Sequence, residues 1–171
     1  MEKITNIELD KIKEADEKIN FLLKTLDTAA DGIYWMNKEG QFVYVNDLGC
    51  EILGYDKDEL LRLTIFDVNP HATIEKWNDT WDKIIETGLL NTESIHKRKD
   101  GTEFPVEISS SFVRIENSEF INGFARDISE RKKAEKIIKE KMEELEKINK
   151  IMVSRELDMI KLKEKLNETN L

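Results

Sequence analysis

The last 43 residues of the chain, from Ser129 onward, contain neither proline nor glycine, and their apolar residues recur every seven positions. The recurring residues are Ile138, Leu145, Met152, Met159 and Leu166, with Ile148 and Leu162 three positions after alternate members. This spacing places them on one stripe of a helix and is typical of a coiled coil. A single helix would leave the stripe in water, so the sequence predicts pairing, most simply as a parallel dimer. An antiparallel pairing, or a pairing with an N-terminal helix of the same chain, is the alternative.

Residues 1–26 show the same kind of pattern over a shorter length. Ile12, Ile19 and Leu26 are seven positions apart, and Ala15 and Leu22 lie between them. The resulting apolar face is long enough to pair with another helix but too short to pair strongly. The same face can equally lie on the sheet of its own domain, because amphipathicity does not say which surface covers it. The predicted dimer seam consists of Ile12, Ile19 and Leu26 together with the seven apolar residues of the C-terminal helix named above.

Between these helices, residues 27–128 are predicted to form one α+β domain. The predicted strands are rich in aromatic and β-branched residues and are separated by turn sequences such as NKEG and KDG. Predicted strands cover 32–37, 41–46, 92–98, 103–114 and 119–127, and predicted helices cover 46–53 and 74–88. Two strands, then helices, then three strands describe an antiparallel sheet around a single core.

The helix predicted over 74–88 follows the break at Pro70 and has an apolar face. Ile74, Trp77, Trp81, Ile84 and Ile85 fall on that face, and Gly88 ends the helix. Two tryptophans on one stripe are more often part of a core than of a cofactor site. The sequence therefore favours core positions for Trp77 and Trp81.

The boundary between the domain and the C-terminal helix carries a helix-start signal. Asp127 and Glu130 have the spacing of a capping box. Asp127 or Ser129 can accept hydrogen bonds from the first N–H groups of the helix, a contribution of about 1 kcal/mol. The boundary is either an ordinary helix start or a point where strain in the sheet reaches an output helix. The second interpretation makes Asp127, Ser129 and Glu130 signal-transmitting residues.

Composition excludes several kinds of partner. The formal net charge is −9, and the acidic excess lies before Ser129, where 26 acidic residues face 15 basic ones. An acidic domain is a poor partner for nucleic-acid phosphates. The single cysteine, Cys50, excludes an intrachain disulfide and a cysteine-rich zinc site. No apolar run approaches the roughly 20 residues of a membrane span. We therefore expect a cytoplasmic protein with no nucleic-acid partner, no metal site and no membrane segment in this chain.

Four strings, in the order NKEGQFVYVND, EILGYDKDELL, HKRKDGTEFPVEIS and GFARDISERKKAE, carry a family resemblance. Together they resemble a PAS domain of the S-box type, found in bacterial and archaeal sensor histidine kinases, over about residues 23–135. The resemblance implies a five-stranded antiparallel sheet with helices on one face that enclose a small pocket. It also implies that Asp127 to Ser129 is the signal-transmitting junction, that such domains pair through their flanking helices, and that 129–171 is a coiled-coil signalling helix.

The direction of the His96 side chain depends on the length of the turn that follows it. A two-residue turn places His96 on the face of Pro105, whereas a three-residue turn with a left-handed Gly101 places it with Val106 and Ile108. The hairpin usual in the resembled family favours the second arrangement. The candidate pocket then comprises Tyr34, Met36, Ile52, Trp77, Trp81, His96, Val106, Ile108, Ser110, Ile121 and Ala125.

The sequence identifies no cofactor. Haem is disfavoured, because haem-binding members of the resembled family use a histidine within the helix after His71, where this chain has tryptophans and acids. Flavin is disfavoured too, because the cysteine motif of light-sensing members is absent around Cys50, which we interpret as core filling. Tyr34, Trp35, Trp77 and Trp81 could stack on a flavin held without an adduct, but aromatic content is weak evidence.

No catalytic signature is present. The chain has no P-loop, GxSxG or HExxH motif, and neither His71 nor His96 lies in the context of a phosphoacceptor histidine. We therefore expect a non-enzymatic sensor module for a small ligand, a redox change or a pH change, which signals through a dimeric coiled coil to a histidine kinase or similar output. Its partners would be a second copy and components of a sensor kinase or response-regulator pathway. The alternative is a non-sensing scaffold that dimerises and binds other proteins.

Overall fold

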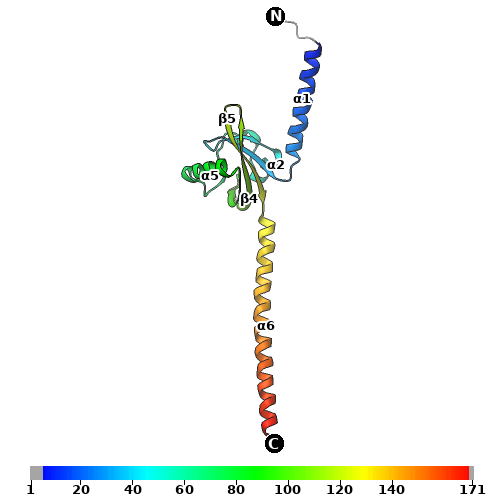
Figure 1. Ribbon diagram of the computed structural model, residues 1–171, viewed down its shortest axis with the longest axis vertical. Helices are drawn as coiled ribbons and strands as arrows, with labels where there is room; N and C mark the ends of the chain where they lie inside the picture. The colour runs from blue at the N-terminus through cyan, green and yellow to red at the C-terminus, as the bar shows by residue number, and fades with distance from the viewer. Residues whose placement is uncertain (1–5, 170–171) are drawn as a thin grey trace. The chain divides into compact units, whose positions relative to one another are not determined.

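The computed structural model describes the backbone of residues 6–169 and the side chains of residues 16–161. The chain divides into two compact units, Met1–Ser129 and Glu130–Leu171. The first unit contains helix α1 (Asn6–Asp27) and an α+β domain, and the second is formed by helix α6 (Ser129–Thr169), which begins at the last residue of the first unit (Figure 1).

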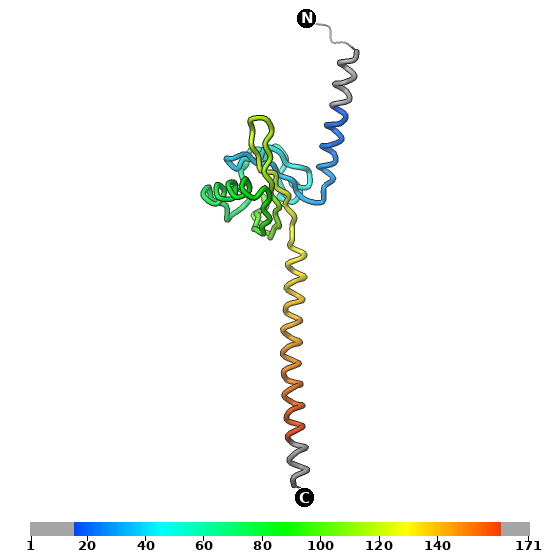
Figure 2. The backbone as a smooth tube through the Cα atoms, viewed as in Figure 1, coloured from blue at the N-terminus to red at the C-terminus, as the bar shows by residue number. Residues whose placement is uncertain are grey.

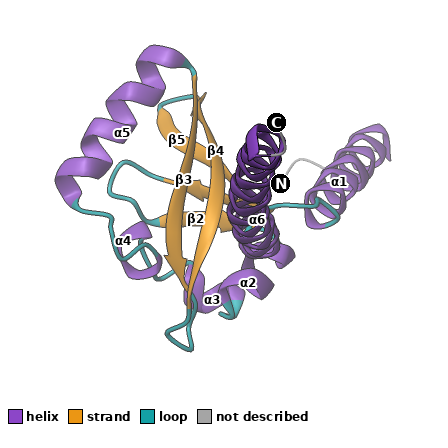
Figure 3. Ribbon diagram, turned by 90° about the horizontal axis from the view of Figure 1, so that it is seen from below, coloured by secondary structure: helices purple, strands orange, loops and turns teal. Residues whose placement is uncertain are grey.

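The domain is built on one five-stranded antiparallel sheet with the strand order β2-β1-β5-β4-β3. Its strands are β1 (Gly32–Met36), β2 (Phe42–Val45), β3 (Leu89–Lys97), β4 (Glu103–Ile115) and β5 (Ser118–Asp127). The helices α2 (Asp47–Leu53), α3 (Lys57–Leu60), α4 (Ile65–Val68) and α5 (Ile74–Thr87) lie on one face of the sheet (Figure 3). The predicted α+β architecture, with helices on one face of a five-stranded antiparallel sheet, is confirmed.

Local signals account for most helix ends in the domain. Asn46 accepts a hydrogen bond from Gly49 N at the start of α2, and Gly54 ends this helix in the left-handed conformation with φ 74°. The capping box at the start of α3 pairs Asp56 with Glu59. The helix α4, which has a capping box between Thr64 and Asp67, was not predicted. Four residues are too few to display a helical period.

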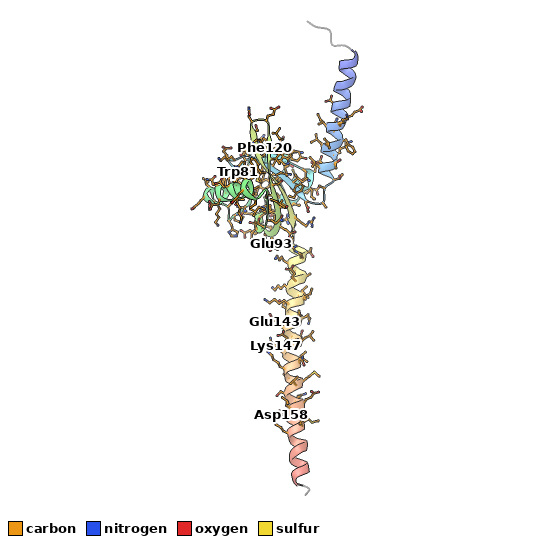
Figure 4. All side chains as sticks on the ribbon, viewed as in Figure 1. Trp81, Glu93, Phe120, Glu143, Lys147 and Asp158 are labelled. Carbon is orange, nitrogen blue, oxygen red and sulfur yellow. The ribbon has the colours of Figure 1, made fainter. Side chains whose placement is uncertain are left out.

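Helix α5 buries part of its apolar stripe. Trp77, Trp81 and Ile84 are buried, whereas Ile74 and Ile85 are 71% and 47% exposed. Ile74 is the first residue of the helix, and Ile85 follows the buried Ile84, so its side chain is rotated by about 100° around the helix axis. Trp81, labelled in Figure 4, packs edge-on against Phe112 of β4 with ring centroids 6.1 Å apart.

Asn46 ties the start of α2 to three other segments. Its Oδ1 accepts hydrogen bonds from Ile33 N at 2.8 Å and Gly49 N at 2.9 Å, and its Nδ2 donates to Leu26 O and Asp31 O. The side chain is fully buried with each of these bonds made, so it stabilises the fold at little desolvation cost.

Helix α6 makes up most of the second unit. It runs unbroken for 41 residues, and its surface carries ion pairs such as Lys136–Glu140 and Lys141–Glu144. The backbone tube of Figure 2 follows its course, and Figure 4 labels Glu143, Lys147 and Asp158 among its exposed side chains. No helix in the described part of the chain is both long enough and apolar enough to cross a membrane.

The predicted seam residues with described side chains are mostly exposed. Leu26 and Ile19 lie on α1, where Leu26 is half-buried and Ile19 exposed, and the exposed seam residues of α6 are Ile138, Leu145, Ile148, Met152 and Met159. The side chains of Ile12, Leu162 and Leu166 lie outside the described residues. The predicted stripe of α6 is therefore open to solvent in a single chain wherever its side chains are described.

Candidate functional site: the inner cavity and the junction

The β3–β4 hairpin places His96 on the inner face of the sheet. Arg98 N donates to Thr102 O, and the three residues between them form the turn, with Gly101 at φ 88°. His96 lies opposite Phe104, so it shares a face with Val106 and Ile108. This is the second of the two predicted registers.

The His96 imidazole is buried and incompletely hydrogen-bonded. The residue is 4% exposed, and its Nε2 has no hydrogen-bond partner among the described residues. Burial lowers the pKa of His96 to about 4. The imidazole is therefore neutral at neutral pH and can donate or accept one hydrogen bond at Nε2, depending on its tautomer.

His96 contributes to the wall of a small inner cavity of about 30 Å³. The other lining residues come from the sheet and from helices α2 and α4; they are Tyr34, Met36, Phe42, Leu53, Ile65, Val68, Ile108, Gly123 and Ala125. The Tyr34 hydroxyl already donates to Gly49 O at 3.0 Å. The cavity is therefore an apolar chamber whose unpartnered polar atom is His96 Nε2.

A larger groove of about 310 Å³ lies beside this cavity, between α5, the segment 69–72 and strands β3 and β4. Met36, Ile65 and Ile108 line both the groove and the inner cavity. Asn69 and Lys76 order the mouth of the groove, because Asn69 Nδ2 donates to Ser94 Oγ and Lys76 Nζ donates to His71 O. His71 is exposed at this mouth.

The structure separates the eleven predicted pocket residues into three groups. Tyr34, Met36, His96, Ile108 and Ala125 line the inner cavity, and Met36, Trp77, Ile108 and Ser110 line the groove. Ile52, Trp81, Val106 and Ile121 line neither space and pack in or against the hydrophobic core. Five cavity residues were missed. Ile65 and Val68 lie on the unpredicted helix α4, whereas Phe42, Leu53 and Gly123 lie in predicted elements but gave no signal of facing a cavity.

Cys50 is half-buried and packs against the core, and burial raises the pKa of its thiol. Among the described residues, no group of three or more His, Cys, Asp or Glu side chains is arranged to hold a metal ion. The chemistry of this site is therefore that of an apolar chamber with a neutral imidazole.

At the junction, Asp127 makes two hydrogen bonds. Its Oδ1 accepts from Ser129 N at 2.8 Å, and its Oδ2 accepts from Arg98 Nη2 at 2.6 Å. Partial burial acts to raise the pKa of Asp127, but the hydrogen bonds from Ser129 and Arg98 outweigh it and lower this pKa below its ordinary value. Glu130 bonds to Lys133 Nζ at 2.8 Å. Asp127 thus bonds to the N–H group at the first residue of α6.

Arg98 connects the junction to Ile52 and Phe104, which adjoin the cavity residues Leu53 and His96, and sequence reasoning missed it. Its Nη1 donates to Ile52 O near the end of α2, and its guanidinium lies over the Phe104 ring, 3.9 Å from the centroid. The neighbouring Lys99 N donates to Leu53 O at 2.9 Å. Arg98 therefore contacts α2, an inner-face residue of β4 and Asp127. Its position beside the KDG turn was visible in the sequence, but the contacts span 29 and 46 residues.

The opposite face of the sheet carries a polar groove and an aromatic cluster. The groove has a volume of about 490 Å³ and includes the ion pair of Arg126 with Asp31, whose Nε–Oδ1 distance is 2.6 Å. Trp35 contacts Phe120, labelled in Figure 4, and Tyr44 with ring centroids about 6 Å apart. This face therefore offers both polar and aromatic surface outside the helical cover.

Comparison with known proteins identifies the class of this domain. A family model described as PAS domain matches residues 30–130, more than half of the chain. The chain therefore belongs to the PAS domain family, whose members are sensory domains of signalling proteins. The match spans the whole sheet and ends at the junction.

Two curated relatives are signalling proteins. The methyl sulfide methyltransferase-associated sensor of Methanosarcina acetivorans is 28% identical over 127 residues, which cover 74% of this chain. The probable diguanylate cyclase DgcE of Escherichia coli is 27% identical over 138 residues, which cover 78% of this chain. The matched region spans only 12% of the length of each relative.

Solved structures share the fold. The PAS domain of an HTR-like protein from Haloarcula marismortui has a TM-score of 0.65 at 23% identity, over 70% of this chain and 98% of that one. A domain of the sensory box sensor histidine kinase/response regulator from Geobacter sulfurreducens has a TM-score of 0.55 at 26% identity, over 64% and 94%. These structures are similar to the domain described here over nearly their whole lengths.

Proposed function

We propose that this chain is the sensory input module of a signalling protein and that Arg98 transmits the state of the cavity to helix α6. The observation that carries the proposal is the set of contacts made by the Arg98 guanidinium. It reaches Ile52 O, the Phe104 ring and Asp127, which bonds to the first N–H group of α6. A ligand that displaces α2 or Phe104 would therefore also strain the Arg98–Asp127 pair.

Asp127, Ser129 and Glu130 are proposed as the transmitting residues, with Asp127 as the acceptor for the Ser129 N–H group. A change at Asp127 would alter the register or rotation of paired α6 helices. Couplings of this kind are typically about 1–3 kcal/mol, enough to bias two packings of a coiled coil.

The proposed partner of α6 is the α6 of a second copy. The exposed apolar stripe of this helix supports a parallel homodimer, in which the predicted seam residues meet. The proposed output is a histidine kinase or a similar domain, and the proposed location is the cytoplasm. Similar structures include domains of a two-component sensor histidine kinase and of a sensory box sensor histidine kinase/response regulator, which supports that output, and the chain itself would contribute no catalytic residue.

The test is a fusion of this chain to a histidine kinase catalytic region. Replacing Arg98 or Asp127 by alanine should change autophosphorylation by about 5–150-fold, the usual range of allosteric coupling. Arg98→Lys should restore only part of the response, because lysine lacks the planar fork. Arg114→Ala is the matched control, because Arg114 pairs with Glu119 in the β4–β5 hairpin. Unchanged kinase activity in folded Arg98 and Asp127 variants would contradict the proposal.

A second candidate function is a non-sensing scaffold, and the small volume of the inner cavity favours it. At about 30 Å³ the cavity has room for little more than one water molecule. Native mass spectrometry of the purified protein separates the two functions. A retained small molecule supports the sensor, whereas a ligand-free dimer that binds a protein partner supports the scaffold.

A further inference from the structure

The inner cavity and the open groove are separated by a thin partition. Met36, Ile65 and Ile108 line both spaces, so a movement of this partition would join the small chamber to the larger groove. Isoleucine is β-branched and stiff at its first side-chain torsion, whereas methionine has an unbranched, flexible side chain. Met36 is therefore the partition residue best able to move.

Gly123 leaves space beside the methyl group of Met36. A Cβ atom added at Gly123 would lie 3.7 Å from Met36 Cε and 3.7 Å from Ser110 Oγ, which is ordinary contact. The Gly123 backbone is not left-handed, so alanine could occupy this position without conformational strain. The absence of a side chain here keeps part of the chamber empty and leaves Met36 free to change its rotamer.

The chamber is suited to an uncharged molecule. Lys, Arg, Asp and Glu are absent from its lining, and an ion placed there would lose its hydration without compensation. A water molecule needs two to four polar partners, and the chamber offers His96 Nε2 while the Tyr34 hydroxyl proton is already donated to Gly49 O. An apolar body with one hydrogen-bonding group would satisfy His96 Nε2 and fill the apolar space.

We propose that the ligand is an uncharged, largely apolar molecule with one hydrogen-bonding group, which enters through the groove between α5 and β3, displaces Met36 and bonds to His96 Nε2. This inference rests on the proposed sensory function. It adds the ligand class, the entry route and the two residues that control them. Either neutral tautomer of His96 serves, because a hydroxyl group on the ligand can donate or accept.

Phenol, toluene and benzoate are the probes for this proposal. Their binding to the full chain is followed by NMR, through the side-chain nitrogen resonances of His96 and the methyl resonance of Met36. Phenol should shift both resonances and bind about tenfold more tightly than toluene, the effect of one additional hydrogen bond at a buried site. Benzoate should leave both resonances unchanged at the same concentration.

Variants separate the roles of the two residues. His96→Leu should bind phenol and toluene with about equal affinity, since the hydrogen bond is lost while the apolar space remains. Gly123→Ala should weaken the binding of both phenol and toluene, because the added methyl group occupies the chamber. His71→Ala is the matched histidine control at the mouth of the groove and should keep the preference for phenol.

Several results would overturn the proposal. Equal affinity for phenol and toluene in the parent chain, stronger binding of benzoate, or unchanged phenol binding in the Gly123→Ala variant would each do so. A crystal structure grown with phenol that has only an ordered water on His96 Nε2 would have the same consequence. The kinase fusion distinguishes this failure from that of the proposed function. If phenol binds but the kinase does not respond, only the proposed sensory function is contradicted. If the kinase activity changes in Arg98→Ala but the parent chain does not bind phenol, only the proposed ligand class is contradicted.

Discussion

The domain and helix α6 use apolar residues in opposite ways. In the domain, Leu53 and Ile84 are fully buried, whereas Leu145 and Met152 of α6 are 63% and 58% exposed. The sheet and its helices bury their own apolar faces, so the domain has the core of an independently folding unit. The described seam residues of α6 are exposed in their own unit, so their burial depends on a partner. Substitutions should therefore affect folding in the first region and association in the second.

The largest effect is expected for Trp81→Ala in the domain core. Trp81 of α5 is 1% exposed and packs against Phe112 of β4, so its truncation should lower the free energy of unfolding by about 3–5 kcal/mol. Urea denaturation followed by circular dichroism measures the change. Ile85→Ala, at an exposed position on the same helix, is the control and should cost less than a third as much. Similar losses for both variants would contradict the placement of α5.

A second effect, about 3 kcal/mol at most, is expected from the titration of His96. Its pKa is about 4 in the folded protein, against an ordinary value of 6.5, so the unfolded chain binds the proton first as the pH falls. The contribution of neutral, buried His96 to the free energy of unfolding is fully present above pH 6.5. It is lost as the pH falls toward 4, by about 1.4 kcal/mol for each unit of pKa shift. Thermal unfolding across this range should have a shallower pH dependence in His96→Leu than in His71→Ala. Equal dependence in the two variants would show that His96 is not the group responsible.

A smaller effect is expected in α6, where Leu145→Ala should weaken self-association without changing the unfolding of the domain. Removing a seam leucine from a paired coiled coil costs about 2 kcal/mol. Sedimentation equilibrium of the full chain measures the dimer dissociation constant. Val153→Ala, at a position outside the seam, should leave this constant nearly unchanged. If the parent chain is monomeric, the seam of α6 has no partner, and the expected contrast between folding in the domain and association in α6 is wrong.

The smallest effect is expected for Gly54→Ala at the end of α2. Gly54 has φ 74°, and the nearest atom to an added Cβ is Lys99 Cβ at 3.9 Å, so the cost is conformational and not steric. A left-handed alanine should lower the free energy of unfolding by about 1 kcal/mol. Chemical denaturation detects a change of this size. Gly123→Ala, where the backbone is not left-handed, is the control; a larger loss there would indicate steric conflict in the chamber.

Patterns between near neighbours in the sequence determined much of this fold. Gly88 and the KDG turn predicted a helix end and a hairpin that the structure contains. Such signals act over three or four residues, so the sequence displays them directly. The inner face of β4 also followed from its alternation, once the turn length was known.

The cavity and the Arg98 contacts were decided by the tertiary structure. Leu53, Ile65 and Gly123 meet at the cavity although they are far apart in the sequence, and the unpredicted helix α4 supplies one of them. Arg98 reaches Ile52 and Asp127 because the β3–β4 turn lies beside the end of α2. Local periodicity determines which face of an element is buried, but strand register and helix placement determine which buried residues leave a space between them. That is why the sequence alone predicted the sheet, its helical cover and the seam, while Met36, Gly123 and Arg98 acquired their roles only through contacts in three dimensions.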